Sequence, residues 1–175
     1  MREMTSAGAT LSLFDQEPVG DEELRGCVEA IYLAGPRGTP RVRVERVRAV
    51  AGMGLEGDRN FGRRGRLIGK YAPMRQVTLI EAEALDAVRA AGRELAAADA
   101  RRNVVTRGVR LNALVGRTFR VGGATLRGVE RCDPCTHLGR LTYRGVVRDL
   151  HERGGLRAEV LESGEIGEGD ELAAL

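Results

Sequence analysis

Two of the three cysteines and one of the two histidines of this chain fall within the six residues from Cys132 to His137. Thiolate sulfur and imidazole nitrogen are the soft metal ligands and the nucleophiles of proteins. A chain with so few of them has little reason to gather them unless thiolate chemistry or metal binding happens there. The first candidate site is therefore the run Arg131-Cys132-Asp133-Pro134-Cys135-Thr136-His137-Leu138.

Four roles are open to the Cys132-x-x-Cys135 pair. A dithiol redox pair normally opens a helix within a β-α-β unit, whereas this motif follows an expected strand and contains Pro134. A zinc site would need both cysteines together with His137 and His151, and their spacing is unlike that of common zinc motifs. A purely structural role for both cysteines also stays open.

The fourth role, one thiolate that binds a soft, high-valent metal, fits this run best. Such a site needs one deprotonated sulfur, an open position for a substrate, and cations that hold the rest of a cofactor. Arg131, next to the motif, would favour the thiolate electrostatically. The run therefore predicts a sulfur-coordinated cofactor that carries negative charge.

A second unusual run extends over residues 101–108 and contains three arginines in its first seven positions. Arginine binds phosphate through paired, charge-assisted hydrogen bonds, each contributing about 1.5–3 kcal/mol where water is excluded. The alternative is that these arginines are merely solvated loop residues. The candidate anion-binding groups are Arg101, Arg102, Asn103 and Arg107, with Thr106 of the same run and Arg131 added to them.

A glycine-rich segment over residues 52–69 forms the third candidate element. Its six glycines stand among charged residues, so we expect a long loop, and loops of this length are usually functional or disordered. The glycines of the part Gly54–Gly62 allow close approach of the backbone to a ligand, which Asp58 or Arg59 could reach.

Short strands are the elements that must position these residues. Alternating or continuous apolar patterns, separated by Gly and Pro turns, predict them. Cys27 should be a buried thiol in the first strand, and a bend is expected near residues 47–50. Residues 163–172 should close a final hairpin with the last strand. The expected strands are 27–33, 41–46, 76–80, 104–105, 118–121, 124–130 and 156–161, with a Gly122-Gly123 hairpin turn.

Helices are fewer in the expected fold. Residues 80–91 are rich in helix formers, Thr78 and Glu81 have the spacing of a capping box, and Gly92 should end this helix. A one-turn helix is expected over residues 111–114 and a short helix within 144–153. The sequence therefore predicts a mainly β protein with a few helices (α+β), built as a small closed or nearly closed barrel.

A length of 175 residues indicates one domain with a terminal extension: a partly ordered arm over residues 1–25 and the domain over 26–175. The segment Met1–Ala9 lacks the apolar core of a signal peptide, and no apolar run is long enough to span a membrane. We therefore expect a cytoplasmic protein, where reducing conditions keep Cys132 and Cys135 as thiols.

Arginine dominates the basic residues, because Lys70 is the only lysine among 28 basic side chains. This composition supplies many oxyanion binders and almost no Schiff-base candidates. Acidic residues alternate with the basic ones, so no broad basic face is expected, and nucleic acid is not an expected partner.

Taken together, the motifs resemble the MOSC domain, which is named for the C-terminal part of molybdenum cofactor sulfurases. The resemblance runs from about Gly26 to the C-terminus and is strongest to small stand-alone bacterial members. The segments that carry it are Gly54-Leu55-Glu56-Gly57-Asp58-Arg59, Arg75-Gln76-Val77-Thr78-Leu79-Ile80, the run at 101–108, Leu114-Val115-Gly116, Cys132-x-Pro134-Cys135-x-His137-Leu138 and Gly154-Gly155-Leu156-Arg157-Ala158.

This resemblance implies a barrel-like, mostly β fold that binds molybdenum cofactor, a pterin with a phosphate. In the related amidoxime-reducing proteins the second cysteine of a C-x-x-C binds molybdenum, which corresponds to Cys135. An Arg-x-Asn of the cofactor pocket corresponds to Arg101 and Asn103, and an Asp-Arg pair gives Arg59. Those relatives reduce N-hydroxylated, hydroxylamine-type compounds with electrons from a partner protein, and this chain departs from them at Asp133-Pro134.

The favoured hypothesis is an oxidoreductase that reduces a small N-hydroxylated substrate through Cys135-bound molybdenum. Independently of the resemblance, His137 could donate a proton near the metal. Pyridoxal phosphate is not expected, since it would require Lys70 in a loop with no partner for the pyridinium nitrogen. Two alternatives stay open, namely a non-catalytic carrier of sulfur or cofactor, with Cys135 as the carrying thiol, and a zinc-stabilised structural module.

Overall fold

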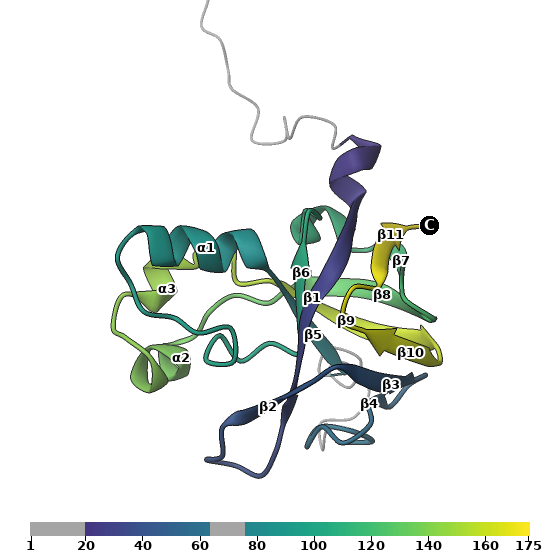
Figure 1. Ribbon diagram of the computed structural model, residues 1–175, viewed down its shortest axis with the longest axis horizontal. Coiled ribbons are helices and arrows are strands. Elements are labelled where there is room, and N and C mark those ends of the chain that lie inside the picture. Colours follow the sequence, from purple (N-terminus) through teal and green to yellow (C-terminus); the bar gives the residue numbers. More distant parts are fainter. Residues whose placement is uncertain (1–19, 64–75) are drawn as a thin grey trace, which may run out of the picture.

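A computed structural model describes residues 20–63 and 76–175 and shows strands that outnumber helices (Figure 1). The strands are β1 (Arg25–Ala34), β2 (Arg41–Val44), β3 (Arg46–Val50), β4 (Gly54–Leu55), β5 (Val77–Glu81), β6 (Val104–Arg107), β7 (Thr118–Val121), β8 (Ala124–Arg131), β9 (Leu156–Glu162), β10 (Gly164–Gly167) and β11 (Glu171–Ala174). The helices are α1 (Ala82–Ala90), α2 (Thr136–Leu141) and α3 (Val146–Asp149), with single turns η1 (Asp21–Leu24) and η3 (Leu111–Leu114).

Seven strands close into a barrel in the order β11-β7-β8-β9-β5-β6-β1, and β1 pairs again with β11. The pair β5–β6 is parallel, whereas the other neighbours in the barrel are antiparallel. Strand β2 pairs with the far end of β1, and β10, β3 and β4 form a small second sheet. The mainly β, MOSC-type small barrel expected from the sequence is confirmed.

Two hydrophobic cores hold these layers together. The first fills the barrel with inward side chains such as Ile31, Leu79 and Phe119, which are completely buried. The second joins the outer face of β5 and β6 to the helices through residues such as Ile80 and Leu85. As a result all three helices lie on one side of the barrel, as Figure 1 shows.

Helix α2 follows directly after the cysteine motif, where the sequence predicts only a loop. Its residues Thr136 and Gly139 are weak helix formers, so local propensity gives little signal. The helix is stabilised by tertiary packing, because Leu138 is buried in the second core together with Val146 and Leu150. Cys135 is consequently the residue that immediately precedes a helix.

Most predicted elements are present, but the final hairpin is wrong. Strand β9 pairs with β8 and β5, β10 pairs with β3, and β11 pairs with β7 and β1. The three successive strands therefore pair with five other strands and not with one another. Strands β9 and β11 belong to the barrel and β10 to the small second sheet, and because their partners lie far away in sequence, the local pattern did not predict these pairings.

Two side-chain predictions are also wrong. Cys27 lies in β1 but is exposed, since its side chain is on the outer face while Val28 points into the barrel core. Thr78 does not cap α1, whose N-cap residue is Glu81 without a side-chain cap bond. Thr78 lies inside β5, and its hydroxyl instead hydrogen-bonds to Asn103. The expected bend near 47–50 is found slightly earlier, at Glu45 between β2 and β3.

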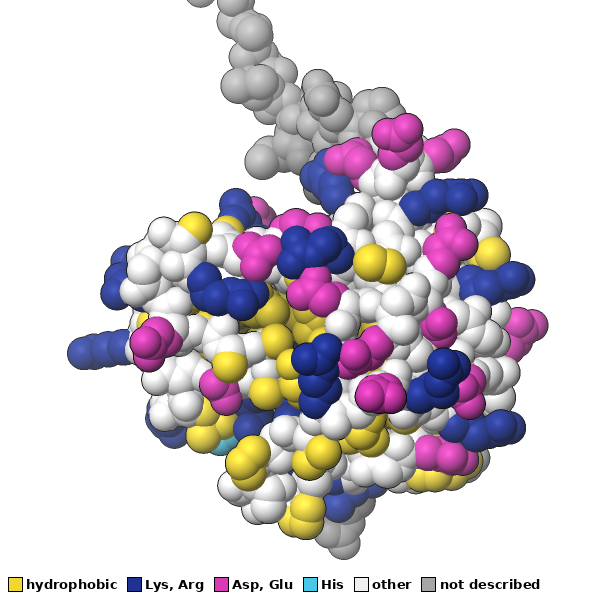
Figure 2. Space-filling view, viewed as in Figure 1, with side chains coloured by type: hydrophobic (Ala, Val, Ile, Leu, Met, Phe, Trp, Pro, Cys, Tyr) yellow, Lys and Arg dark blue, Asp and Glu magenta, His cyan; other side chains and the backbone are white. Residues whose placement is uncertain are grey.

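Several predictions fall on residues outside the described ranges. These are Lys70, most of the N-terminal arm, and residues 64–69 of the glycine-rich loop; β1 itself begins at Arg25. Within residues 20–63 and 76–175, none of the helices is long and apolar enough to cross a membrane. Figure 2 shows basic and acidic side chains interleaved over one face of the molecule.

Candidate functional site

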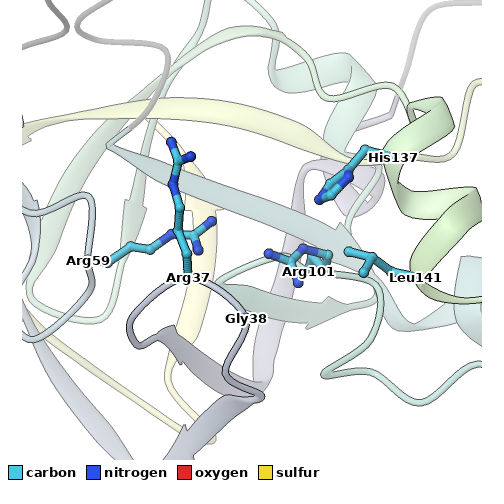
Figure 3. A pocket seen from close by; sticks show the side chains of 6 residues that line it. All are labelled: Arg37, Gly38, Arg59, Arg101, His137 and Leu141. Carbon is cyan, nitrogen blue, oxygen red and sulfur yellow. The ribbon is translucent and has the colours of Figure 1, made fainter.

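A cavity of about 440 Å³ lies where the loop after β4, the β1–β2 turn and helix α2 approach one another. Three arginines line it from three segments that are distant in sequence: Arg37, Arg59 and Arg101. His137 and Leu141 of α2 complete the wall. Figure 3 shows Arg37 and Arg59 on one side and the two α2 residues on the other, with Arg101 between them.

Asp58 fixes the loop that carries Arg59. Its buried carboxylate accepts hydrogen bonds from the backbone N–H groups of Ala34 (2.8 Å) and Asn60 (2.9 Å) and from Nδ2 of Asn103 (2.9 Å). The N–H of Arg59 also donates to the carbonyl of Ala34 at 2.8 Å. The loop is therefore attached to the end of β1, and Arg59 is held at the cavity.

Asn103 joins this loop to the barrel rather than facing the cavity. Its Oδ1 accepts from the N–H and the hydroxyl of Thr78, and its Nδ2 donates to the carbonyl of Tyr32 and to Asp58. The amide group thus uses both donors and its acceptor within the protein. Asn103 positions Asp58 and, through it, Arg59.

Arg101 reaches the cavity from an unusual backbone conformation, with φ of 61°. Left-handed backbone is unfavourable for residues with a Cβ atom and is found at strained functional positions. Its carbonyl accepts a 2.9 Å hydrogen bond from Nη2 of Arg41. The residue that follows, Arg102, is fixed by three further hydrogen bonds, so the surroundings determine the conformation of Arg101.

Arg102 is buried and organises the cysteine motif. Its guanidinium donates to the carbonyls of Gly154 (2.8 Å), Ala100 (3.2 Å) and Cys132 (2.8 Å). Burial lowers the pKa of Arg102, while the neighbouring Cys132 and Cys135 act in the opposite direction. Arg102 therefore supports the site from behind rather than lining the cavity.

The two cysteines of the motif have different environments. Cys132 is buried, and its N–H donates to the carbonyl of Gly155 at 2.7 Å. Cys135 is exposed and caps α2, with its carbonyl accepting from the N–H groups of Leu138 and Gly139. Of the two motif cysteines, the exposed one is therefore Cys135, directly before the short helix whose residues His137 and Leu141 line the cavity.

Three of the predicted anion-binding residues lie elsewhere. Thr106 is fully buried in β6, with its hydroxyl 3.4 Å from the carbonyl of Ile80. Arg107 is paired with Glu29 and Asp86 on an exposed face, and these hydrogen bonds raise the pKa of Arg107.

Arg131 extends to Glu152, with 3.7 Å between Nη1 and Oε1. The predicted residues that share the cavity are thus Arg59, Arg101 and His137, with Asn103 and Arg102 behind them.

Three residues of the site were not candidates from the sequence: Arg37, Arg41 and Leu141. Arg37 lies within the turn of residues 35–40 between β1 and β2, and Arg41 follows that turn as the first residue of β2. Only the pairing of these strands brings the turn to the loop of Arg59. Leu141 depends on α2. The sequence signal that could have identified them was one arginine within, and one directly after, a turn rich in Gly and Pro.

The described residues offer no cluster of side chains that could bind a metal ion by themselves. Over the described residues, no group of three His, Cys, Asp or Glu side chains is placed to hold a metal ion. The four-ligand zinc site built from Cys132, Cys135, His137 and His151 therefore lacks the necessary geometry, and the zinc-stabilised module has no support here. A cofactor that brings its own ligands to one thiolate remains compatible with this arrangement.

The MOSC domain family matches residues 67–173, well over half of the chain. The chain belongs to the MOSC domain family. The match contains the run at 101–108, the cysteine motif and α2, and it therefore includes the residues that build the cavity wall around Arg101 and His137. No curated protein matches the chain in sequence.

Solved structures share the fold of this MOSC protein at low sequence identity. The YuaD protein from Bacillus subtilis is 20% identical with a TM-score of 0.71, over 85% of this chain and 94% of that chain. YiiM from Geobacillus stearothermophilus is 14% identical with a TM-score of 0.63, over 86% and 75%. YiiM from Escherichia coli is 19% identical with a TM-score of 0.59, over 85% and 69%. These structural similarities show that the chain has the same fold as these proteins.

Proposed function

We propose that this MOSC protein binds molybdenum cofactor in the arginine-lined cavity and reduces small N-hydroxylated compounds, with Cys135 as the protein ligand of molybdenum. The observation that carries the proposal is the position of α2. Exposed Cys135 immediately precedes this helix and is not itself a lining residue of the cavity, whereas His137, two residues later, lines it together with three guanidinium groups. A cationic cavity whose wall includes a residue two positions after an exposed cysteine suits a cofactor with a phosphate and a soft metal.

Arg37, Arg59 and Arg101 would hold the phosphate of the pterin. Guanidinium groups bind phosphate through paired, charge-assisted hydrogen bonds, and the three side chains come from independent segments. Asp58 and Asn103 hold the Arg59 loop in place, so its guanidinium needs less ordering when a ligand binds. When bound, the cofactor supplies the exchange of electrons with the substrate.

His137 would supply a proton to the substrate. Imidazole exchanges protons near neutral pH, and this side chain lines the same cavity as Arg59 and Arg101. Reduction of an N–O bond releases water and consumes two electrons and two protons. The electrons would come from a partner protein, and His137 would deliver one proton at the cavity.

Metal analysis tests the assignment of Cys135. Protein is made in a host that produces molybdenum cofactor, and molybdenum per chain is measured for wild type, Cys135→Ala and Cys27→Ala. Cys27 is the matched control because its thiol is also exposed but lies in β1. We expect wild type and Cys27→Ala to retain stoichiometric molybdenum and Cys135→Ala to lose at least about nine-tenths of it, as removal of a metal–sulfur ligand implies.

Equal molybdenum in wild type and Cys135→Ala would overturn the proposal. The exposure of Cys135 also suits the alternative of a sulfur carrier, because a transferring thiol must meet its partner. Mass spectrometry separates the two functions. An extra sulfur atom on Cys135, in protein that contains no molybdenum and does not reduce hydroxylamine, would favour the carrier.

A further inference from the structure

Arg41, the first residue of β2, carries a buried guanidinium group. Its side chain is only 8% exposed, and it is not a lining residue of the arginine-lined cavity. Among the described residues, its Nε and Nη1 atoms are buried and have no hydrogen-bond partner. Burying donors without partners is unfavourable, so these two nitrogens add nothing to the stability of the fold. Because the group is enclosed, any part that Arg41 has in the site is exerted through its neighbours.

Three links connect Arg41 to the segments that carry the cavity arginines. Along the chain, it directly follows the turn between β1 and β2, which carries Arg37. Its Nη2 donates a 2.9 Å hydrogen bond to the carbonyl of Arg101. Its Nη1 lies 3.9 Å from Oδ2 of Asp58, a side chain that is 3% exposed and directly precedes Arg59. One buried guanidinium therefore connects all three segments.

The hydrogen bond to Arg101 acts on a strained backbone. A residue with a Cβ atom rarely adopts φ of 61°, and this conformation persists only where the surroundings fix it. The N–H of Arg101 donates to the carbonyl of Ala98 at 3.2 Å, and its own carbonyl accepts from Arg41. Loss of the Arg41 donor would release the carbonyl side of this residue, so the direction of the Arg101 side chain would be less restricted.

Repulsion among the cavity arginines makes such support important. Three guanidinium groups enter the cavity from separate segments, and none of its lining residues within the described ranges is acidic (Figure 3). Like charges that share one cavity repel, so the side chains would turn away from one another unless their backbones are held. Burial lowers the pKa of Arg41 to about 10, Asp58 opposes this shift, and the nearby arginines add to it. Arg41 is therefore still charged at neutral pH and can attract Asp58.

We propose that Arg41 is a positioning residue for anion binding, which holds Arg37, Arg59 and Arg101 at the cavity without contacting the anion. This role does not depend on molybdenum. That the anion is the phosphate of the pterin rests on the proposed function. The experiment therefore uses protein from a host that makes no molybdenum cofactor, and it measures the binding of inorganic pyrophosphate in magnesium-free buffer.

Isothermal titration calorimetry at constant ionic strength compares wild type, Arg41→Met and the control Arg43→Gln. Arg43 is a matched control because it is an exposed arginine of the same strand, paired with Glu168. Methionine fills similar space without a donor or a charge, and Asp58 keeps its three other hydrogen bonds. We expect wild type and Arg43→Gln to bind pyrophosphate equally, and Arg41→Met at least about tenfold more weakly, as misplacement of charge-assisted contacts predicts.

A double-mutant cycle separates positioning from other effects of Arg41. In the Arg101→Gln background, Arg41→Met should weaken pyrophosphate binding by less than about threefold, because the side chain through which Arg41 mainly acts is already removed. A direct attraction between the Arg41 charge and the anion, or a general loosening of the fold, would give the same loss in both backgrounds. Equal losses would therefore overturn the inference.

Arg41→Lys keeps the test decisive if Arg41→Met does not fold. It retains the positive charge near Asp58, but its ammonium ends one bond short of the Nη atoms, so both of its contacts lengthen. We expect binding at least about threefold weaker than in wild type, as the loss of a single good contact predicts. Wild-type affinity in either folded variant would overturn the inference.

Arg59→Gln shows which of the two claims fails. We expect this variant to bind pyrophosphate at least about tenfold more weakly than wild type, because Arg59 lines the cavity. Unchanged affinity in Arg59→Gln would count against the phosphate site of the proposed function, and the positioning role would fall with it. Weaker binding in Arg59→Gln together with wild-type affinity in Arg41→Met would overturn the positioning role alone.

Discussion

Arg101 combines a strained backbone with a functional position. Residues with a Cβ atom that adopt positive φ are disfavoured by about 1–3 kcal/mol, and they persist where the surroundings fix them. Here Arg41 binds its carbonyl, and the next residue, Arg102, is fixed to three backbone carbonyls. The strain is thereby compensated by hydrogen bonds on both sides. A rigid backbone of this kind holds the Arg101 side chain in the wall of the cavity.

Glu81 gives a pH-dependent prediction at the same scale. Burial raises the pKa of this half-buried carboxyl, although the N–H of Leu111 donates to its Oε1 at 2.8 Å and acts in the opposite direction. A raised folded-state pKa means that the fold favours the protonated form. Its contribution to stability is present below the unfolded pKa, about 4.3, and is lost as pH rises through the folded value.

Glu81→Gln should therefore stabilise the protein at pH 7 but not at pH 4. The amide keeps an acceptor for Leu111 and carries no charge. We expect Tm to rise by about 1–2 °C at neutral pH, the shift that roughly 0.5 kcal/mol gives for this size. Thermal unfolding at both pH values, with the exposed Glu22→Gln as control, measures this. A variant that is less stable than wild type at pH 7 would show that the hydrogen bond outweighs burial.

At the scale of elements, the cysteine motif is a loop held from two sides. Arg102 binds the carbonyls of Cys132 and Gly154, and the N–H of Cys132 binds the carbonyl of Gly155. Gly154 packs so tightly that an added Cβ would lie 2.4 Å from the carbonyl oxygen of Cys132 and 2.7 Å from Cδ of Pro134. The glycine pair before β9 thus determines where the motif, and hence α2, begins.

Gly154→Ala should displace this loop. Because the clash is with backbone and a proline ring, we expect a loss of roughly 2 kcal/mol or more of unfolding free energy, and reduced molybdenum retention. Gly139→Ala in α2 is the control, since its Cβ would meet only Val146 at 3.9 Å and Val147 at 4.0 Å. Denaturant unfolding and metal content measure both effects. Equal stability of the two variants would show that the loop can move without penalty.

Elements with a local signal were predicted from sequence, and those that depend on tertiary packing were not. The helix at 82–90 and the hairpin of β7 and β8 follow from helix formers and a Gly-Gly turn. Helix α2 has weak helix formers and exists because Leu138 packs in the second core. The exposure of Cys27 depended on which face of β1 points inward, and the alternation in that strand is too imperfect to decide this.

For the candidate site, too, the sequence predicted some residues but not which of them face the cavity. Arg59 and Arg101 were candidates from the sequence pattern and again from the family resemblance, His137 was a candidate from its position in the cysteine motif, and the three share one cavity. Arg102 and Asn103 stand next to Arg101 in sequence but point to the interior, where they bind backbone and side-chain partners. Composition cannot distinguish a side chain that lines a cavity from one that supports it. That distinction comes from the strand pleat and the strained turn at Arg101.

At the scale of the molecule, the barrel is closed by its two ends. Strand β11 pairs with β7 through Leu172 and its neighbours, and β1 pairs with β11 from Arg25 to Cys27. The last strand therefore contributes to the whole sheet although it is only four residues long. Closure also removes the exposed edges that an open sheet of this size would present.

Leu172→Ala tests how strongly closure contributes to stability. The side chain is completely buried in the barrel core, so we expect a loss of about 2–5 kcal/mol, as for other buried leucines. Leu175→Ala, three residues later and 69% exposed, should change stability by less than about 0.5 kcal/mol. Urea denaturation measures both. A loss below about 1 kcal/mol in Leu172→Ala would show that β11 adds little to the folded state.

Because Cys27 and Cys135 are exposed and Cys132 is buried, the three thiols of the native protein should react with an alkylating reagent at different rates. Cys27 and Cys135 should be modified first. Cys132 should be modified more slowly, because the reagent reaches it only after local opening of the surrounding structure. The rate of this third modification, measured by mass spectrometry of the intact chain, reports how often the segment between β8 and α2 opens. A slower modification of Cys132 in the presence of an anion would show that anion binding stabilises the closed form of this segment.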